Sequence, residues 1–274
     1  MPELPEVETI KRALEPIMTG HSIDKVETFI DVMRYPLKPL HAPELTNSKI
    51  VSVRRRGRYI IIELENLQAF IVHLGMSGSI RVVPPEVQRK KHEHIVIYLN
   101  SGETFRFDCP RRFGFMKVAT LEKSGALPQE LAHLGAEPLS EEFTAEYLHT
   151  ALKKRHGNIK SVIMDNKLVV GVGNIYAAES LFMSKISPLR TASTLTLKQC
   201  SALVAVIKDV LTRAIEAGGT TIADYKSVDG SEGKFVLQLR MYGKDGQPCP
   251  ECGDKIEQRR LGGRSSCYCP RCQK

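Results

Sequence analysis

The chain begins Met1-Pro2-Glu3-Leu4-Pro5-Glu6-Val7-Glu8, with prolines and acidic residues ahead of an apolar run at helical spacing. An initiator methionine followed by proline is normally removed, so we expect the working chain to begin with a free secondary amine at Pro2. Such an amine can attack a sugar carbon and form an iminium, which is an electron sink. Glu3 follows directly and could supply a proton to the bond that opens. The alternative is an ordinary helix start, for which proline and acidic residues are also typical.

The apolar positions Val7, Ile10, Leu14 and Ile17 follow helical spacing up to Gly20. Pro2 and Glu3 therefore lie at the amino end of a predicted helix. That end carries the positive pole of the helix dipole and free N–H groups, so it is a natural place for a phosphate.

Short β-branched and aromatic runs follow, separated by turn residues, and this pattern predicts a β-sandwich or barrel. The predicted strands are residues 50–53, 59–64, 69–74, 94–99, 103–107 and 115–118.

The pattern changes near residues 134–139, where we place a linker, and the segments beyond it are helical. The predicted helices are residues 144–155, 159–164, 175–184 and 197–217. The polar, glycine-containing stretch 220–233 is expected to be a mobile loop.

The chain ends in two cysteine pairs, Cys249-x2-Cys252 and Cys269-x2-Cys272, separated by sixteen residues. This spacing is typical of a structural zinc site in which four thiolates complete a tetrahedron and leave no open position. Cys267 competes with Cys269, but only Cys269 forms the two-residue spacing with Cys272. We therefore predict one structural Zn²⁺, on which a module of this size depends for folding.

Several basic segments could contact phosphate. Residues 259–264 (Arg-Arg-Leu-Gly-Gly-Arg) form the apex of the predicted zinc module, and residues 54–58 and 153–156 are also basic. A solvated surface is the alternative for each of them.

Residues 171–174 (Gly-Val-Gly-Asn) open a helix and suit a backbone phosphate. A dinucleotide fingerprint is excluded, because Tyr176 occupies the third glycine position. Arg111 and Phe113, on a tight loop, could fill a duplex from which a base has been extruded. Met76 could be a second wedge or a core residue.

Composition agrees with an acidic partner. The 274 residues carry a net charge of +8, and the pI is near 9.1. No apolar run is long enough to span a bilayer and no signal peptide precedes the acidic start, so we expect a cytoplasmic, nucleoid-associated protein.

Together these segments resemble the formamidopyrimidine-DNA glycosylase family of bacterial base-excision enzymes. The resemblance covers essentially the whole chain. It rests on residues 2–8, 73–78 (His-Leu-Gly-Met-Ser-Gly), 111–114 (Arg-Arg-Phe-Gly), 171–176 and the terminal cysteine pairs. The sister family, endonuclease VIII, usually begins Pro-Glu-Gly-Pro, so Leu4 favours the branch that acts on oxidised purines.

The resemblance implies an α+β fold in three parts. Residues 1–134 would form an N-terminal β-sandwich that carries the catalytic helix. Residues 135–234 would form a helix-two-turn-helix DNA-binding domain, and residues 235–274 the zinc finger. The implied partner is double-stranded DNA with an oxidised purine or an abasic site, bound by a monomer that has no membrane association.

The resemblance also implies roles for individual residues. Pro2 would attack C1′, Glu3 would protonate the sugar ring oxygen, and Glu6 would be a second nearby carboxylate. The oxidised purine (8-oxoguanine or a formamidopyrimidine) would leave, and β- and δ-elimination would cut the strand. Arg264 would assist the elimination. The expected DNA contacts are His73, Met76, His92, Arg111, Phe113, Arg155, Asn174, Tyr242 and Arg264. The stretch 220–233 would close over the extruded base.

One residue departs from the family pattern. Arg58 stands where the family usually has a lysine credited with helping β-elimination. Arginine can hold a phosphate bidentately, but with a pKa above about 12 it is a poor proton donor near neutral pH. We therefore expect an intact glycosylase step and a slower lyase step.

Two other functions remain open at this point. The chain could be a non-catalytic zinc-ribbon DNA-binding protein, in which Pro2 has no chemical role, or an oxidised-pyrimidine glycosylase of the sister type. A retained Met1 would turn the Pro2 nitrogen into an amide and abolish the chemistry.

Overall fold

The computed structural model describes residues 1–220 and 234–274, and the chain forms two compact units. The first unit comprises Met1–Ala132 with Ala217–Lys234, and the second comprises His133–Glu216 with Phe235–Lys274. The expected α+β class, with an N-terminal sandwich and a C-terminal four-cysteine module, is confirmed. The division into three domains stays a prediction. Within the described residues, no helix is both long and apolar enough to cross a bilayer.

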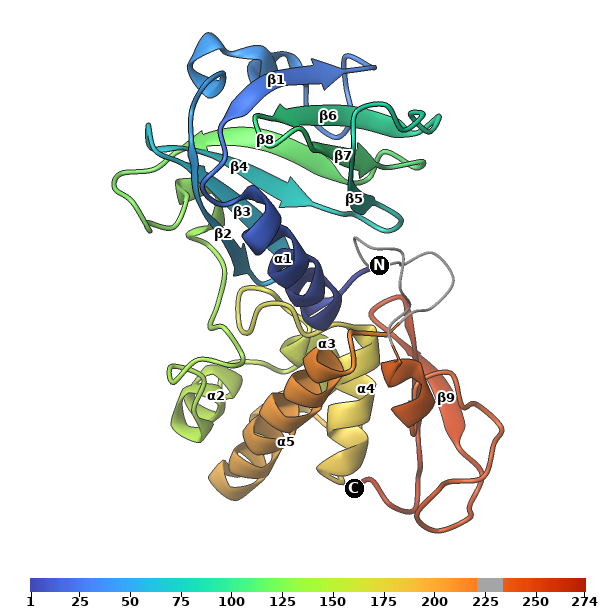
Figure 1. The fold of residues 1–274 in the computed structure, drawn as a ribbon. Helices are drawn as coiled ribbons and strands as arrows, with labels where there is room; N and C mark the ends of the chain where they lie inside the picture. The colour runs from blue at the N-terminus through green and yellow to red at the C-terminus, as the bar shows by residue number, and fades with distance from the viewer. Residues whose placement is uncertain (221–233) are drawn as a thin grey trace. The chain divides into compact units, whose positions relative to one another are not determined.

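Two four-stranded antiparallel sheets form the sandwich of the first unit (Figure 1). One sheet has the order β1-β6-β7-β5, with bounds Ile23–Thr28, Glu93–Leu99, Thr104–Asp108 and Ser79–Val83. The other has the order β2-β3-β4-β8, with bounds Ile50–Arg56, Tyr59–Leu64, Gln68–His73 and Phe115–Thr120. The described residues of this unit also form the 3-10 turns η1 (Lys38–His41), η2 (Pro43–Leu45) and η3 (Gln129–Leu131).

The core of the sandwich comes from alternating positions of facing strands. Ile60 and Ile62 of β3 and Phe105 and Phe107 of β7 are fully buried in one apolar cluster. Period-two alternation places such side chains on one face of each sheet. All six predicted strands are present. Strands β1 and β5 lie outside the prediction, because charged residues interrupt their short apolar patterns.

Helix α1 (Leu4–Met18) packs against β2 and β3. Its buried stripe includes Val7, Ile10 and Leu14, which also belong to the sandwich core. Pro5 is tolerated in the first turn, where its missing N–H would have no intrahelical partner. The sandwich core therefore fixes the helix that begins next to Pro2.

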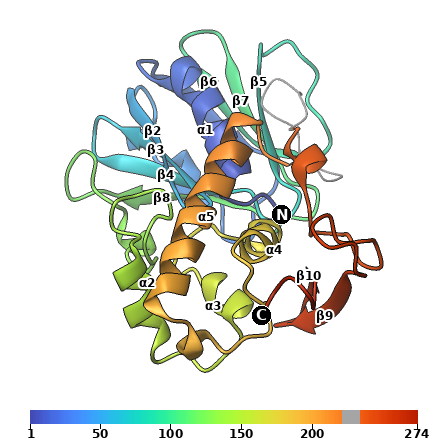
Figure 2. The ribbon, with the colours of Figure 1, turned by 90° about the horizontal axis from the view of Figure 1, so that it is seen from below.

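The second unit is mainly helical, and Figure 2 shows its longest helix beside two shorter ones. Its elements are α2 (Ala145–Leu152), α3 (Ile159–Ile163), α4 (Asn174–Met183), α5 (Leu197–Glu216), η4 (Ala192–Thr194) and η5 (Phe235–Gln238). Helix α5 packs on α2 and α4, and its buried residues include Val204, Ile207, Leu211 and Ile215.

Strands β9 (Glu257–Leu261) and β10 (Arg264–Tyr268) form an antiparallel hairpin in the second unit. Gly262 and Gly263 make its turn with φ of 53° and 78°. Both values lie in the left-handed region, which two-residue hairpin turns of this kind require and glycine adopts without strain.

Candidate functional site

The amino terminus is held by a network around the Glu6 carboxylate. Glu3 is the N-cap of α1 and donates its N–H to Glu6 Oε2 at 2.7 Å. The other oxygen of Glu6 accepts the N–H of Thr220 at 2.8 Å, the last described residue before the stretch 221–233. Glu3 and Glu6 are only 4% and 2% exposed. Two buried N–H donors therefore fix the carboxylate of Glu6 beside Pro2.

Gly219 lets the backbone before Thr220 lie close to the Glu6 side chain. Its φ is +82°, and a Cβ at this position would lie 3.1 Å from the Glu6 side chain. The positive φ favours glycine, and an added Cβ would press on the Glu6 side chain. Of the expected closing loop, 220–233, all residues after Thr220 lie outside the described part of the chain.

Arg58 lies close to the chain end. Its side chain is 8% exposed, and one terminal nitrogen lies 3.9 Å from Met1 Sδ. Arg58, which the resemblance aligns with a lysine, thus lies beside the first residue of the chain.

Two other arginines of the same basic run have structural partners. Arg54 forms an ion pair with the buried Glu63 at 3.0 Å and donates to the Gly125 carbonyl at 2.9 Å. Arg55 pairs with Glu8 of α1 at 2.7 Å. Burial raises the pKa of Glu8, but the hydrogen bond and charge of Arg55 outweigh it and lower the pKa overall. These two arginines therefore join strands and helix.

His73 ends β4 as a half-buried ring that is uncharged near neutral pH. Burial, followed by the charges of Arg58 and Arg34, lowers the pKa of His73 to about 4. The ring lies against Phe115 at 5.6 Å, and its Nδ1 accepts the Gly75 N–H at 3.1 Å. A neutral ring that accepts at Nδ1 carries its proton on Nε2. His73 is therefore suited to donate one hydrogen bond without a charge.

The three predicted wedge residues lie together. Met76 and Phe113 are 45% and 55% exposed, and Arg111 Nε donates to Ser77 Oγ at 3.0 Å. With Met1 and His73 they line a cavity of about 560 Å³ in the first unit. The remaining lining residues are Met33, Arg34, Gly75 and Arg112.

Backbone contact joins the loop that carries Met76 to the loop that carries Arg111 and Phe113. Gly75 has φ of +65°, and a Cβ there would lie 2.4 Å from the Gly114 nitrogen. A Cβ on Gly114 would lie 2.8 Å from the carbonyl oxygens of His73 and Leu74. Only glycine at both positions allows this approach.

In the second unit, Asn174 is the first residue of α4, and its buried Oδ1 has no hydrogen-bond partner among the described residues. Tyr242 is half-buried, and its N–H donates to the Glu179 carboxylate at 2.8 Å. Arg264 is exposed at the start of β10. Arg155 forms an ion pair with Asp165 at 2.8 Å, so its charge is already engaged.

Two buried residues that support these positions escape sequence reasoning. Glu179 accepts the N–H groups of Arg240, Met241 and Tyr242 at 2.8–2.9 Å. Lys160 donates to Ser265 O at 3.0 Å and to Ser266 Oγ at 2.8 Å, directly after Arg264. The sequence signal that could have found them is a single charged residue within an apolar helical run. Such a residue is expected to be buried with the helix, and a buried charge needs a partner.

The four expected cysteine ligands converge. Their Sγ atoms all lie within 4.8 Å of one another, with Cys249–Cys272 at 3.9 Å and Cys252–Cys269 at 3.5 Å. Thiolates about 2.3 Å from a central zinc would be about 3.8 Å apart, so the cluster fits a tetrahedral metal site. Cys267 is not part of the cluster and lies 3.8 Å from Gln258 Oε1.

Three family models match the chain. They are described as the formamidopyrimidine-DNA glycosylase N-terminal domain (residues 1–116), its H2TH domain (134–226) and the zinc finger found in FPG and IleRS (246–274). Formamidopyrimidine-DNA glycosylases from Dichelobacter nodosus and Pectobacterium atrosepticum are 45% and 46% identical over the full length of both chains.

Solved structures are also similar over nearly the whole chain. The MutM (FPG) protein from Thermus thermophilus has a TM-score of 0.86 at 36% identity, covering 99% of this chain and 98% of its own. A Lactococcus lactis FPG mutant, in complex with DNA containing Fapy-dG, has a TM-score of 0.89 at 31% identity, covering 100% of both chains.

The contact between Gly75 and Gly114 yields a stability prediction. Gly75→Ala should lower the free energy of unfolding by about 2–5 kcal/mol, from left-handed strain plus overpacking. Gly102→Ala is the matched control, because Gly102 has φ of +87° but nothing within 4 Å of its added Cβ. It should lose only about 1–2 kcal/mol. Urea unfolding measures both, and equal losses would contradict the close approach.

Proposed function

This chain belongs to the formamidopyrimidine-DNA glycosylase family, and we propose that it excises oxidised purines from duplex DNA through Pro2. It is a DNA glycosylase. The observation that carries the residue assignment is the buried start of α1, where Glu3 and the fixed Glu6 carboxylate closely follow Pro2 in the chain. Such an enzyme would work at the nucleoid in the cytoplasm.

The first step is proposed as follows. The lone pair of the Pro2 amine forms a bond to C1′, and the bond from C1′ to the purine breaks, with its electron pair leaving on the base. The proton that the Pro2 nitrogen loses passes to the departing base. The bond from C1′ to the ring oxygen then opens, and Glu3 gives that oxygen a proton. The product is an iminium between Pro2 and C1′.

The strand is then cut by elimination. The iminium draws electrons from C2′, which loses a proton, and the 3′-phosphate leaves. In a second elimination along the conjugated chain, C4′ loses a proton and the 5′-phosphate leaves. Glu6 accepts two backbone N–H groups, so we assign it the task of holding Glu3 and the chain end in place. Arg264 is proposed to assist the elimination.

The DNA contacts divide by chemistry. Met76, Arg111 and Phe113 would fill the space left by the extruded nucleoside, since Met76 and Phe113 are exposed apolar side chains and Arg111 can replace lost base contacts. His73, His92, Asn174 and Tyr242 would contact the backbone, as would Arg155 after leaving Asp165. Affinity should fall steeply with added salt, because phosphate neutralisation releases counterions.

We propose that the metal held by the four cysteines is one Zn²⁺. When bound, it would supply structure and no chemistry, because four thiolates leave no open position. It would fix the hairpin β9–β10 and thereby Arg264 at its turn.

The variant Pro2→Gly tests the role of the Pro2 amine directly. Mass spectrometry first verifies that the sample has lost Met1. Parent enzyme mixed with 8-oxoguanine DNA and borohydride should become covalently attached to DNA. The variant should lose roughly 10²-fold or more of its excision, since it replaces the secondary amine and disturbs its placement. Pro5→Ala is the matched control and should still be trapped. Undiminished excision by the Gly variant would overturn the proposal.

Arg58 is tested with Arg58→Lys. The lysine can supply a proton near neutral pH, so strand cutting at a preformed abasic site should accelerate by about tenfold. Release of 8-oxoguanine should change little. Arg56→Lys is the control and should cut at the parent's rate. Equal cutting rates for the parent and Arg58→Lys would refute the proposed effect of residue 58 on the lyase step.

The metal is tested with Cys272→Ser beside Cys267→Ser. The first should lose its zinc, measured by elemental analysis, and bind DNA at least about tenfold more weakly, because the module depends on its metal to fold. The second should keep one zinc per chain, since Cys267 lies outside the cluster. Loss of zinc from both variants would contradict the assigned ligand set.

A further inference from the structure

The loop between β5 and β6, residues 84–92, carries an unassigned basic tip. Its last four residues are Arg89, Lys90, Lys91 and His92, and the first three are exposed. The family resemblance assigns a DNA contact only to His92. An exposed loop with three adjacent cations would ordinarily vary in conformation, because like charges repel and surface loops are mobile.

A buried arginine binds the first half of this loop. Arg106 of β7 is 3% exposed, and its guanidinium donates to the carbonyl oxygens of Val87 at 2.7 Å, Pro84 at 3.0 Å and Pro85 at 3.2 Å. Its Nε donates to Thr104 Oγ1 at 2.9 Å. One side chain thus orders three loop carbonyls with charge-assisted hydrogen bonds.

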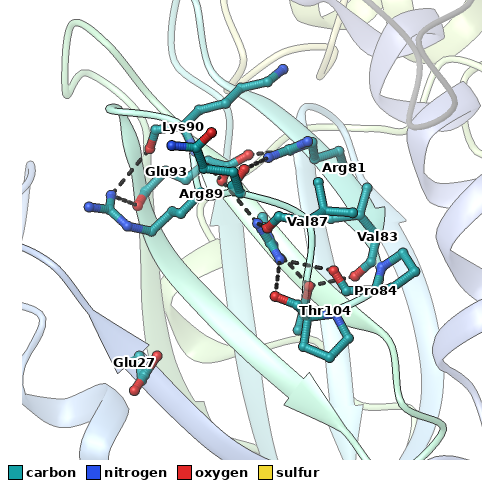
Figure 3. Close-up of polar contacts among 12 residues, drawn as sticks. Glu27, Arg81, Val83, Pro84, Val87, Arg89, Lys90, Glu93 and Thr104 are labelled. Carbon is teal, nitrogen blue, oxygen red and sulfur yellow. Dashed lines mark hydrogen bonds and ion pairs between the residues drawn. The ribbon is translucent and has the colours of Figure 1, made fainter.

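Two further arginines bind the second half (Figure 3). Arg81 of β5 donates to the Gln88 carbonyl at 3.2 Å. Arg89 donates to the carbonyls of Lys90 at 3.2 Å and Glu93 at 3.0 Å, and it stacks 3.9 Å above the Phe29 ring. The charge of Arg89 is therefore used inside the loop.

Glu93 joins these groups. It is fully buried, accepts hydrogen bonds from Arg81 and from the Lys90 N–H at 2.9 Å, and lies 3.6 Å from Arg106. Burial raises the pKa of Glu93, but the partners Arg81, Lys90 N–H and Arg106 lower it overall, so the carboxylate stays charged. The network is therefore an ionic one that engages both sides of the loop.

The side chains of Lys90 and Lys91 are not part of this network. In Figure 3 the side chain of Lys90 leads away from the network. Lys90 and Lys91 have no ion pair among those found in the described residues. The carbonyl of His92 accepts the Cys109 N–H at 2.9 Å, which ties this loop to the start of the wedge loop 110–114.

We propose that Arg106, Arg81 and Glu93 are positioning residues that hold Lys90, Lys91 and His92 as a preformed clamp for DNA phosphates. The proposal rests on the proposed function in taking duplex DNA as the ligand. Prior ordering removes the entropy that a free loop would lose on binding. The backbone tie through Cys109 N–H sets the clamp in register with Arg111 and Phe113.

A double-mutant cycle tests this coupling. The ligand is a duplex with a tetrahydrofuran abasic analogue, and Kd is measured at several KCl concentrations. Replacing both lysines (Lys90→Gln with Lys91→Gln) should reduce the slope of log Kd against log salt by about 2. Each lost phosphate contact lowers this slope by about 0.9, and two contacts are lost. Arg106→Lys should weaken binding roughly tenfold in the parent and less than about twofold in the lysine-free loop.

A purely structural role predicts a different result. In that case Arg106→Lys would weaken binding by the same factor in both backgrounds, and this outcome overturns the proposal. An unchanged salt slope in the lysine-free loop overturns it as well. If Arg106→Lys does not fold, Arg81→Lys goes through the same cycle, since it loses the bond to Gln88 and keeps the charge.

Two controls complete the experiment. Replacing Lys38 and Lys123, exposed lysines elsewhere in the first unit, with Gln removes the same charge and should leave the slope within about 0.5 of the parent. Borohydride trapping of the parent tests the proposed function separately. If the parent binds DNA but is not trapped, the proposed Pro2 chemistry is wrong and the clamp proposal is unaffected. If the parent is trapped but the effects of the loop and Arg106 variants simply add, the clamp proposal is wrong and the Pro2 chemistry is unaffected.

Discussion

The Glu6 carboxylate is the contact on which the catalytic end of the chain depends. It accepts the N–H of Glu3 with one oxygen and the N–H of Thr220 with the other. Two residues more than two hundred positions apart are thus joined at the start of α1. Because the carboxylate is buried, leaving either N–H without its acceptor would cost more than a surface hydrogen bond. A free chain end, normally among the most mobile parts of a protein, is thereby held in place.

The same physical device recurs elsewhere in the molecule. Glu179 accepts three successive N–H groups that end at Tyr242, and Lys160 binds the strand next to Arg264. Arg106 binds three carbonyls of one loop. In each case a buried charge is satisfied by backbone groups, which fixes a segment whose exposed neighbour can meet a ligand. The fold thus uses buried ionic groups to position surface ones.

Arginine has two different uses within one short run. Arg54 pairs with Glu63 of the neighbouring strand and Arg55 pairs with Glu8 of α1, whereas Arg58 lies beside the chain end. The basic run alone does not show which arginines are paired, because the partners Glu63 and Glu8 lie on other elements. A lysine would bring a transferable proton to the Arg58 position, and the guanidinium does not.

Local signals were enough to predict six strands, the long helices, the four cysteine ligands and the family, because periodicity, pair spacing and terminal motifs can all be read along the chain. Strands β1 and β5 escaped prediction because charged residues interrupt their apolar alternation. Folding alone brought Gly75 against Gly114, Glu6 to Thr220, and Arg106 to the loop at 84–92. These contacts join residues far apart in the chain, and a buried charge reveals its partner only when folding has closed the distance between them.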